Sequence, residues 1–177
     1  MKLKSALATI TVTTMIAASA YAAPAPPGQV FGKLISGQAT EVVAAAEAMP
    51  ADKYDFVPTS GEFKGVRTFG QQLTHIAEAQ YFFFENFGAK PTFDVKSLRK
   101  LTGKDEIVKA LKDSFAFAQQ AAETMTASNA FEEIPAKDGT NTRASITAFS
   151  LAHTNDHYGQ MVVYLRLNGI VPPASRK

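Results

Sequence analysis

The sequence predicts an all-α protein built as a four-helix bundle. Four stretches repeat apolar residues at intervals of three, four and seven, which is the spacing of one face of a helix. No stretch alternates apolar and polar residues over the length of a strand. If residues 1–22 are set aside as a predicted leader, about 155 residues remain, which is enough for a single domain with its own core.

The first two predicted helices have defined ends. Pro50 ends the first helix, and Thr68 begins the second, where Gln71 three residues later completes a capping-box pattern. Gly88 is placed to end the second helix in the left-handed conformation. The apolar positions of the first helix are Val30, Phe31, Leu34, Ile35, Val42 and Val43. Those of the second are Phe69, Leu73, Ile76, Phe83 and Phe87.

The third and fourth helices follow the same logic. The third starts near Thr102, with Asp105 three residues later, and the fourth follows Thr142. Asn168-Gly169 ends the fourth helix, and Pro172-Pro173 prevents any extension. The apolar positions of the third helix are Ile107, Leu111, Phe115, Ala118, Ala122 and Met125. Those of the fourth are Ile146, Phe149, Met161, Tyr164 and Leu167.

The connections between these helices are long. They lie near residues 50–67, 88–102 and 127–141, and each has around 15 residues, whereas roughly two to eight are usual between bundle neighbours. A 15-residue link can stretch to roughly 50 Å, and a 20-residue helix is about 30 Å long. At least one connection can therefore run the length of the bundle and join parallel helices.

Residues 1–22 have the pattern of a cleaved signal peptide. A basic start is followed by an apolar run from Ala6 to Ala18 and then by Ala20-Tyr21-Ala22, the small-x-small motif that signal peptidase reads. The run is shorter than the roughly 20 apolar residues of a membrane-spanning helix, although an uncleaved anchor is the alternative. We therefore expect an exported protein, periplasmic or secreted, without stable membrane insertion after cleavage.

The rest of the chain divides simply. Residues 23–28, rich in proline and alanine, are expected to form a stiff, non-helical tether, and residues 29–177 a single domain.

The formal net charge of +2 includes Lys2 and Lys4 of the predicted signal, so the remainder carries 16 basic and 16 acidic side chains. This balance gives no reason to expect a nucleic-acid partner. The chain has no cysteine, which excludes disulfides, thiolate ligands and a cysteine nucleophile.

The chain contains three histidines, and their spacing indicates a metal site. His153 and His157 are four residues apart on one helix face, where two imidazoles can bind one divalent ion. Both share the apolar stripe of the fourth helix, and His75 lies beside that of the second, so all three are expected to point inward. A buried imidazole needs a partner for each ring nitrogen, which a metal and a hydrogen bond would supply. The alternative is that each histidine is an ordinary core-edge residue bonded to a carbonyl or hydroxyl group.

Other metal motifs fit less well. The zincin motif H-E-x-x-H needs a glutamate where Thr154 stands. A di-iron bundle needs Glu-x-x-His on two helices, and here Gln72 precedes His75 at that spacing. Haem attachment through C-x-x-C-H requires cysteine.

Polar and aromatic residues near the histidines are further candidates. Asp156 is predicted to orient a ligand or accept a proton, and Gln72 and Gln160 to hydrogen-bond a metal-bound water or a substrate. In each case a solvated surface side chain is the alternative. The aromatic run from Tyr81 to Phe84 has more rings than one helix face needs, which indicates core packing together with a pocket wall or a homodimer surface.

Three segments resemble DinB-like (DinB/YfiT) metal-binding four-helix proteins. They are residues 49–58 (MPADKYDFVP), 67–77 (RTFGQQLTHIA) and 152–160 (AHTNDHYGQ). The resemblance implies an up-down-down-up bundle with a long crossover connection. It also implies that His75, His153 and His157 together bind one divalent metal, commonly zinc, nickel or iron. Characterised members include transferases and isomerases that use small cellular thiols, and many members have no known activity.

We therefore expect an exported protein with one metal ion bound by three histidines. Its predicted activity is metal-dependent hydrolysis or group transfer on an unknown small molecule. The alternative is a non-catalytic metal- or small-ligand-binding protein of the cell envelope.

Overall fold

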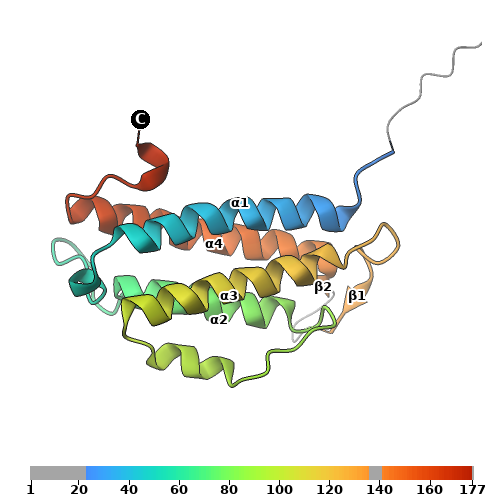
Figure 1. Cartoon of the computed structure of the whole chain (residues 1–177), viewed down its shortest axis with the longest axis horizontal. Coiled ribbons are helices and arrows are strands. Elements are labelled where there is room, and N and C mark those ends of the chain that lie inside the picture. Colours follow the sequence, from blue (N-terminus) through green and yellow to red (C-terminus); the bar gives the residue numbers. More distant parts are fainter. Residues whose placement is uncertain (1–22, 136–140, 177) are drawn as a thin grey trace, which may run out of the picture.

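The computed structural model describes residues 23–135 and 141–176 and confirms a helical bundle. The predicted signal peptide, residues 1–22, lies outside the described residues. The bundle helices are α1 (Pro27–Ala48), α2 (Phe69–Phe84), α3 (Lys104–Glu123) and α4 (Arg143–Leu167) (Figure 1). Short 3₁₀ helices are η1 (Ala51–Lys53), η2 (Val95–Lys100) and η3 (Pro173–Ser175). A two-residue antiparallel ladder, which the sequence did not predict, joins β1 (Glu133–Ile134) to β2 (Asn141–Thr142).

Helix α3 runs antiparallel to α1. At one end of this pair, the Gly28 backbone N–H donates a hydrogen bond to the Met125 carbonyl, with an N···O distance of 3.1 Å. At the other end, Lys104 Nζ donates to the Glu47 carbonyl at 2.8 Å. The start of each helix therefore lies beside the end of the other.

Helix α3 runs parallel to α2. Near their first turns, Gly70 packs so closely on Ile107 that an added Cβ would lie 3.3 Å from Ile107 Cδ1. Further along both helices, the ring centroids of Tyr81 and Phe117 are 4.9 Å apart. Since α4 returns antiparallel to α3 (Figure 1), the order is up-down-down-up, as the family resemblance implied.

Residues 85–103 form the long crossover that the parallel pair requires. This segment runs back along α2 to the start of α3 (Figure 1). Buried Leu98 fixes η2, and Arg99 binds both carboxylate oxygens of Glu78 on α2 at 2.7 and 2.6 Å. The prediction that one connection spans the bundle is confirmed.

The non-helical tether ends earlier than predicted. Pro27 is the first residue of α1, because proline is tolerated where no intrahelical N–H bond is needed. Gly28 is also helical and lies so close to α3 that an added Cβ would be 2.5 Å from the Glu123 carbonyl oxygen. The contact with the end of α3 thus extends α1 into the predicted tether.

The end of the second helix also differs from the prediction, whereas the start of the third agrees with it. Helix α2 ends at Phe84, and the Phe87 N–H instead closes a short turn to the Phe84 carbonyl at 3.1 Å. Gly88 does adopt the left-handed conformation, with φ 105°. Helix α3 begins at Lys104 with Gly103 as its N-cap, which agrees with the predicted start near Thr102.

Some predicted apolar positions face solvent. Val30, Leu34, Phe149 and Leu167 are 45–57% exposed. On α4 the reason is that the buried face is turned toward small polar residues instead of the predicted phenylalanine. This buried face contains Ala144, Thr147, Ser150, Thr154, His157, Met161, Tyr164 and Leu165.

The segment between α1 and α2 positions the start of α2. The Tyr54 hydroxyl donates to the Ala46 carbonyl at 2.8 Å, and the Tyr54 carbonyl accepts from the Gly70 N–H at 2.8 Å. The Phe56 carbonyl accepts from the Phe69 N–H at 3.0 Å. These bonds occupy N–H groups that have no partner within the first turn of a helix.

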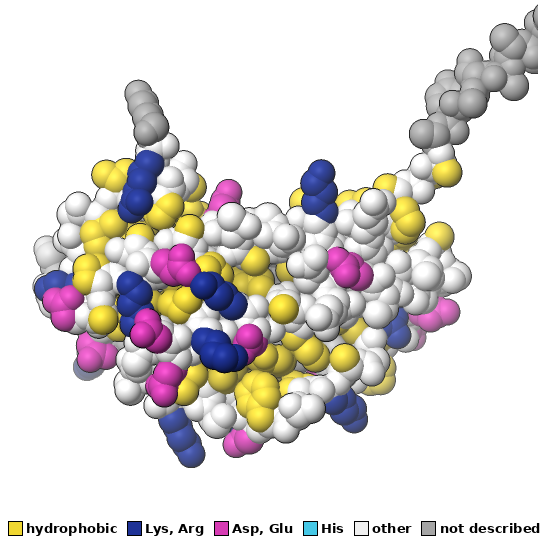
Figure 2. All heavy atoms as spheres, viewed as in Figure 1, with side chains coloured by type: hydrophobic (Ala, Val, Ile, Leu, Met, Phe, Trp, Pro, Cys, Tyr) yellow, Lys and Arg dark blue, Asp and Glu magenta, His cyan; other side chains and the backbone are white. Residues whose placement is uncertain are grey.

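The surface carries both charge signs. Figure 2 shows basic and acidic side chains interspersed on the face it presents, without a basic stripe. Among the described residues, no helix combines the length and hydropathy needed to cross a membrane.

Candidate metal centre

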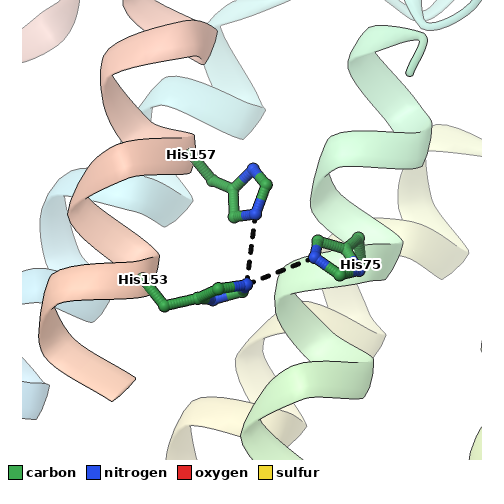
Figure 3. A group of neighbouring side chains, drawn as sticks. All are labelled: His75, His153 and His157. Carbon is green, nitrogen blue, oxygen red and sulfur yellow. Dashed lines mark hydrogen bonds between the residues drawn. The ribbon is translucent and has the colours of Figure 1, made fainter. Parts of the chain in front are cut away.

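The three histidines converge between α2 and α4 (Figure 3). His153 Nε2 lies 3.2 Å from His75 Nε2 and 3.2 Å from His157 Nε2. The candidate ligand atoms of all three side chains lie within 4.8 Å of one another. Nitrogens bound to one zinc ion in tetrahedral directions are about 3.3 Å apart. The spacing in the protein therefore fits a shared divalent ion.

Hydrogen bonding fixes the proton of His157 on the ring nitrogen that faces away from the cluster. His157 Nδ1 lies 2.7 Å from Gln72 Oε1 and donates to it, because an amide oxygen only accepts. His157 Nε2 therefore points toward the other two imidazoles with a bare lone pair. Fixing a metal-binding tautomer in this way is the usual task of a group behind a ligand.

Protons alone cannot satisfy the cluster. A neutral imidazole has one N–H, and His153 Nε2 is equally close to two other ring nitrogens. If His153 Nε2 carries the proton, it can donate to only one of them. If it does not, its lone pair faces the bare nitrogen of His157. A cation shared by the three nitrogens removes this conflict.

All three imidazoles favour the neutral form that binds metals. Burial, with a smaller contribution from the positive charge of Arg67, lowers the pKa of His75 to about 4. Burial and the two neighbouring histidines lower the pKa of His157 to about 4. Burial also lowers the pKa of His153, against the opposing effect of Asp156. At neutral pH the lone pairs are therefore available for a metal.

A chain of hydrogen bonds runs outward from His157. Gln72 Nε2 donates to Gln160 Oε1 at 2.8 Å, and Gln160 Nε2 donates to Asp156 Oδ2 at 3.0 Å. Because the carboxylate can only accept, it sets the orientation of both amides. Gln72 is 1% exposed and Asp156 is exposed, so the hydrogen-bond chain links the buried His157 to a charge at the surface.

A second buried set of hydrogen bonds lies between the same two helices. Gln80 Nε2 donates to Thr154 Oγ1 at 3.1 Å, and Ser150 Oγ donates to Gln80 Oε1 at 2.8 Å. These bonds and the histidine cluster make the α2–α4 contact polar over much of its length. We call this the polar seam, and its members are Gln72, His75, Gln80, Ser150, His153, Thr154, His157 and Gln160.

Two aromatic rings lie close to the His153 ring. The Phe83 ring lies 5.2 Å from the His153 ring, nearly perpendicular to it at 82°. The Phe149 ring is 5.4 Å from Phe83 and 6.4 Å from His153. His153 Nδ1 is buried and has no hydrogen-bond partner within the described part of the chain.

The structure thus brings all six predicted site residues into one network. Gln72 and Gln160 hydrogen-bond to each other; Gln72 also bonds to His157, and Gln160 also bonds to Asp156. The sequence did not reveal this amide chain. A signal was present, because Gln72 lies three residues before His75 and Gln160 three after His157, positions that face each other on antiparallel helices. The contact of Phe149 with His153 was also missed, although the two are four residues apart.

Comparisons with known proteins agree on one family. A family profile described as the DinB superfamily matches residues 35–161. A solved DinB-like protein from Bacillus cereus ATCC 10987 is similar in structure, with a TM-score of 0.70 and 16% sequence identity, covering 82% of this chain and 95% of that one. A DinB-like protein from Bacillus subtilis has a TM-score of 0.63 and 17% identity, covering 79% and 92%. No curated protein matches the chain.

Proposed function

The chain belongs to the DinB superfamily, and on that premise we propose that it is an exported protein that binds one divalent metal for hydrolysis or group transfer. The ligands are His75, His153 and His157. The single observation that carries this proposal is the 3.2 Å approach of His153 Nε2 to the Nε2 atoms of both other histidines. Three protein ligands leave a further coordination position for a substrate, as in catalytic rather than structural sites.

The ligand shell has a defined division of tasks. His75, His153 and His157 supply neutral nitrogens, and Gln72 holds the proton of His157 on Nδ1. Gln160 orients Gln72, and Asp156 orients Gln160. The negative charge of Asp156 stabilises positive charge that develops on the His157 imidazole. Gln72 and Gln160 are therefore positioning residues in this proposal.

A divalent metal supplies Lewis acidity, which polarises a substrate carbonyl or lowers the pKa of a coordinated acid. Where a coordinated acid would ionise, the protein must accept its proton. Asp156 is the carboxylate of the network, it is exposed, and its Oδ1 is available to take a proton while Oδ2 accepts from Gln160.

A second candidate function is metal or small-ligand binding without turnover. This function is favoured because the predicted catalytic groups hydrogen-bond to one another. Both amides are used within the chain from His157 to Asp156. A protein that only holds a metal needs such an arrangement of its ligands and nothing more.

Metal analysis of the purified protein tests the shared core of both functions. We expect about one equivalent of zinc, nickel or iron per chain, bound as isolated or after reconstitution. His153→Ala should reduce this to below about a tenth of an equivalent, because the remaining two imidazoles form a much weaker site. Asn155→Ala is a matched control on the same helix, since Asn155 bonds to Gln38 on α1 at 2.8 Å. Full occupancy of the His153→Ala variant would refute the ligand assignment.

Turnover and export need separate measurements. A screen of the metal-loaded protein against model esters, amides and thiol acceptors, with His153→Ala as the blank, distinguishes the enzyme from the binding protein. For export, the mass of the chain recovered from cells should correspond to cleavage after Ala22. Recovery of a chain that still begins at Met1 would contradict the export proposal.

A further inference from the structure

Aromatic rings from two helices, one half-buried and two exposed, meet beside the proposed metal centre. Phe83 of α2 and Phe149 of α4 contact each other and both flank His153. Phe82 extends the group, with its ring 5.8 Å from that of Phe83. We call Phe82, Phe83 and Phe149 the aromatic wall.

Phe83 packs against the edge of the core, but the other two rings of the wall lie outside it. Phe149 is 57% exposed and Phe82 is 55% exposed, so much of their apolar surface stays in water. On α4 the buried face lies on the other side, along Ser150, Thr154 and His157. Single exposed apolar residues are common, but a cluster that joins two helices next to a ligand residue indicates a binding surface.

The wall continues into a groove. Phe82 also lines a groove of about 550 Å³ between α2 and the crossover, together with Tyr81 and Phe93. The Tyr81 and Phe93 rings pack perpendicular at 5.2 Å. A volume of this size is within the range of small-molecule sites. An aromatic surface therefore extends from His153 toward a space that can hold the rest of a ligand.

We propose that the aromatic wall is the subsite for a flat apolar group, such as a benzene ring, of a small molecule whose polar end binds at the metal centre. The inference rests on the proposed metal-binding function. Ring faces and edges attract another ring placed offset or edge-on, and the wall presents both because Phe83 stands perpendicular to Phe149, at 87°. The wall itself contains no charged or hydrogen-bonding side chain, so it selects for an apolar group.

Two chelators that differ by one ring test the proposal. The zinc-loaded full chain is titrated with benzohydroxamate and with acetohydroxamate, which present the same zinc-binding group with and without a phenyl ring. We expect benzohydroxamate to bind about tenfold more tightly, and Phe149→Ala to reduce this ratio to about twofold. Leu167→Ala is the control, because Leu167 has the same 57% exposure and lies on the same helix, about 27 Å along its axis. This control should leave the ratio unchanged.

The outcomes separate this inference from the metal proposal. A chain that binds none of zinc, nickel and iron refutes the metal function itself, and the wall proposal with it. Zinc binding with equal affinity for the two hydroxamates refutes the wall alone, as does an unchanged ratio in Phe149→Ala. Phe149 is largely exposed, so the variant should fold, which circular dichroism checks. If sedimentation shows that Phe149→Ala instead dissociates a dimer, the wall is an interface between two copies and the subsite is refuted.

Discussion

The two sides of the bundle are held together by different physics. On the α3 side, fully buried apolar side chains such as Leu111 and Phe115 pack into one continuous core with those of α1 and α2. Along the polar seam, buried side chains such as Gln72 and Gln80 hydrogen-bond to partners on α4. The most buried side chains of both regions are shielded from water, but only in the first region does this shielding contribute much free energy.

The difference follows from the energetics of burial. Removing a leucine side chain from water contributes roughly 1.5–3 kcal/mol. A buried hydrogen bond contributes only about 1 kcal/mol net, because the same groups bonded to water in the unfolded chain. The polar seam therefore adds little stability, although each buried polar group left there without a hydrogen bond would lower the free energy of unfolding. A fold that keeps such a seam beside an apolar core uses the core for stability and leaves the seam for function.

The largest expected effect is on the apolar side. Leu111→Ala should lower the free energy of unfolding by about 4 kcal/mol, because Leu111 is 0% exposed and its loss leaves a cavity. Urea unfolding with a chelator present measures this. Phe131→Ala removes a larger side chain that is 78% exposed, and it should change the free energy by less than about 0.5 kcal/mol. Similar effects of the two substitutions on the free energy of unfolding would contradict the view that buried apolar packing supplies most of the stability.

Zinc should stabilise the folded protein only through the histidines of the polar seam. At a free concentration of 100 times its Kd, zinc raises the free energy of unfolding by about 2.7 kcal/mol. The same increment is expected in Leu111→Ala, since distant sites act independently, and almost none in His75→Ala. Thermal or urea unfolding with and without zinc provides the measurement. An increment in His75→Ala equal to that of the unmodified chain would place the ion elsewhere.

Acid should weaken the metal-free protein through the seam. The pKa values of His75 and His157 are about 4 in the fold and about 6.5 when unfolded. Between these values the unfolded chain binds more protons, so the stabilising contribution is complete above pH 6.5 and is lost as the pH falls toward 4. We expect a loss of about 2 kcal/mol, since His75 is half-buried and partly screened by solvent. Urea unfolding at several pH values measures the slope, and a His75→Gln, His157→Gln double variant should flatten it.

The smallest effect concerns the charge at the end of the amide chain. Asp156→Asn keeps an oxygen that can accept from Gln160 but removes the negative charge. Zinc affinity should fall about tenfold, or about 1.4 kcal/mol, while stability without metal stays the same. Competition with a chromophoric chelator measures the affinity. Asp113→Asn on α3 is the matched control, and an equal loss there would show that only overall charge matters.

The fold was largely predictable, because helix signals are local. Thr68 and Thr142 do cap α2 and α4 through side-chain bonds, and the apolar positions of the third helix are buried as predicted. The errors occur where tertiary contacts override local preference. Gly28 is helical because it meets the end of α3, and Phe149 is exposed because α4 buries serine and threonine instead.

For the candidate site, the sequence identified the residues but not their relations. Helical spacing placed His153 and His157 on one face and predicted that His75 also points inward, and the family resemblance implied that all three bind one metal. The bond from His157 to Gln72 depends on the axial register of α2 against α4, which no local pattern specifies. The position of Phe83 beside His153 depends on the same register. Register is set by packing across the whole bundle, so it became visible only in three dimensions.

The three histidines of the candidate metal centre can meet only late in folding. Helix α1 packs on α3 and α4 rather than on α2. During synthesis, α1 and α2 therefore cannot bury their apolar faces against each other before the later helices are made. His75 and His153 are 78 residues apart and become neighbours only once α4 has joined the bundle. Folding through such distant contacts is slower than zipping adjacent hairpins. The candidate metal centre is therefore complete only once α4 has docked, and the ion proposed for it would be bound in the compartment where folding finishes.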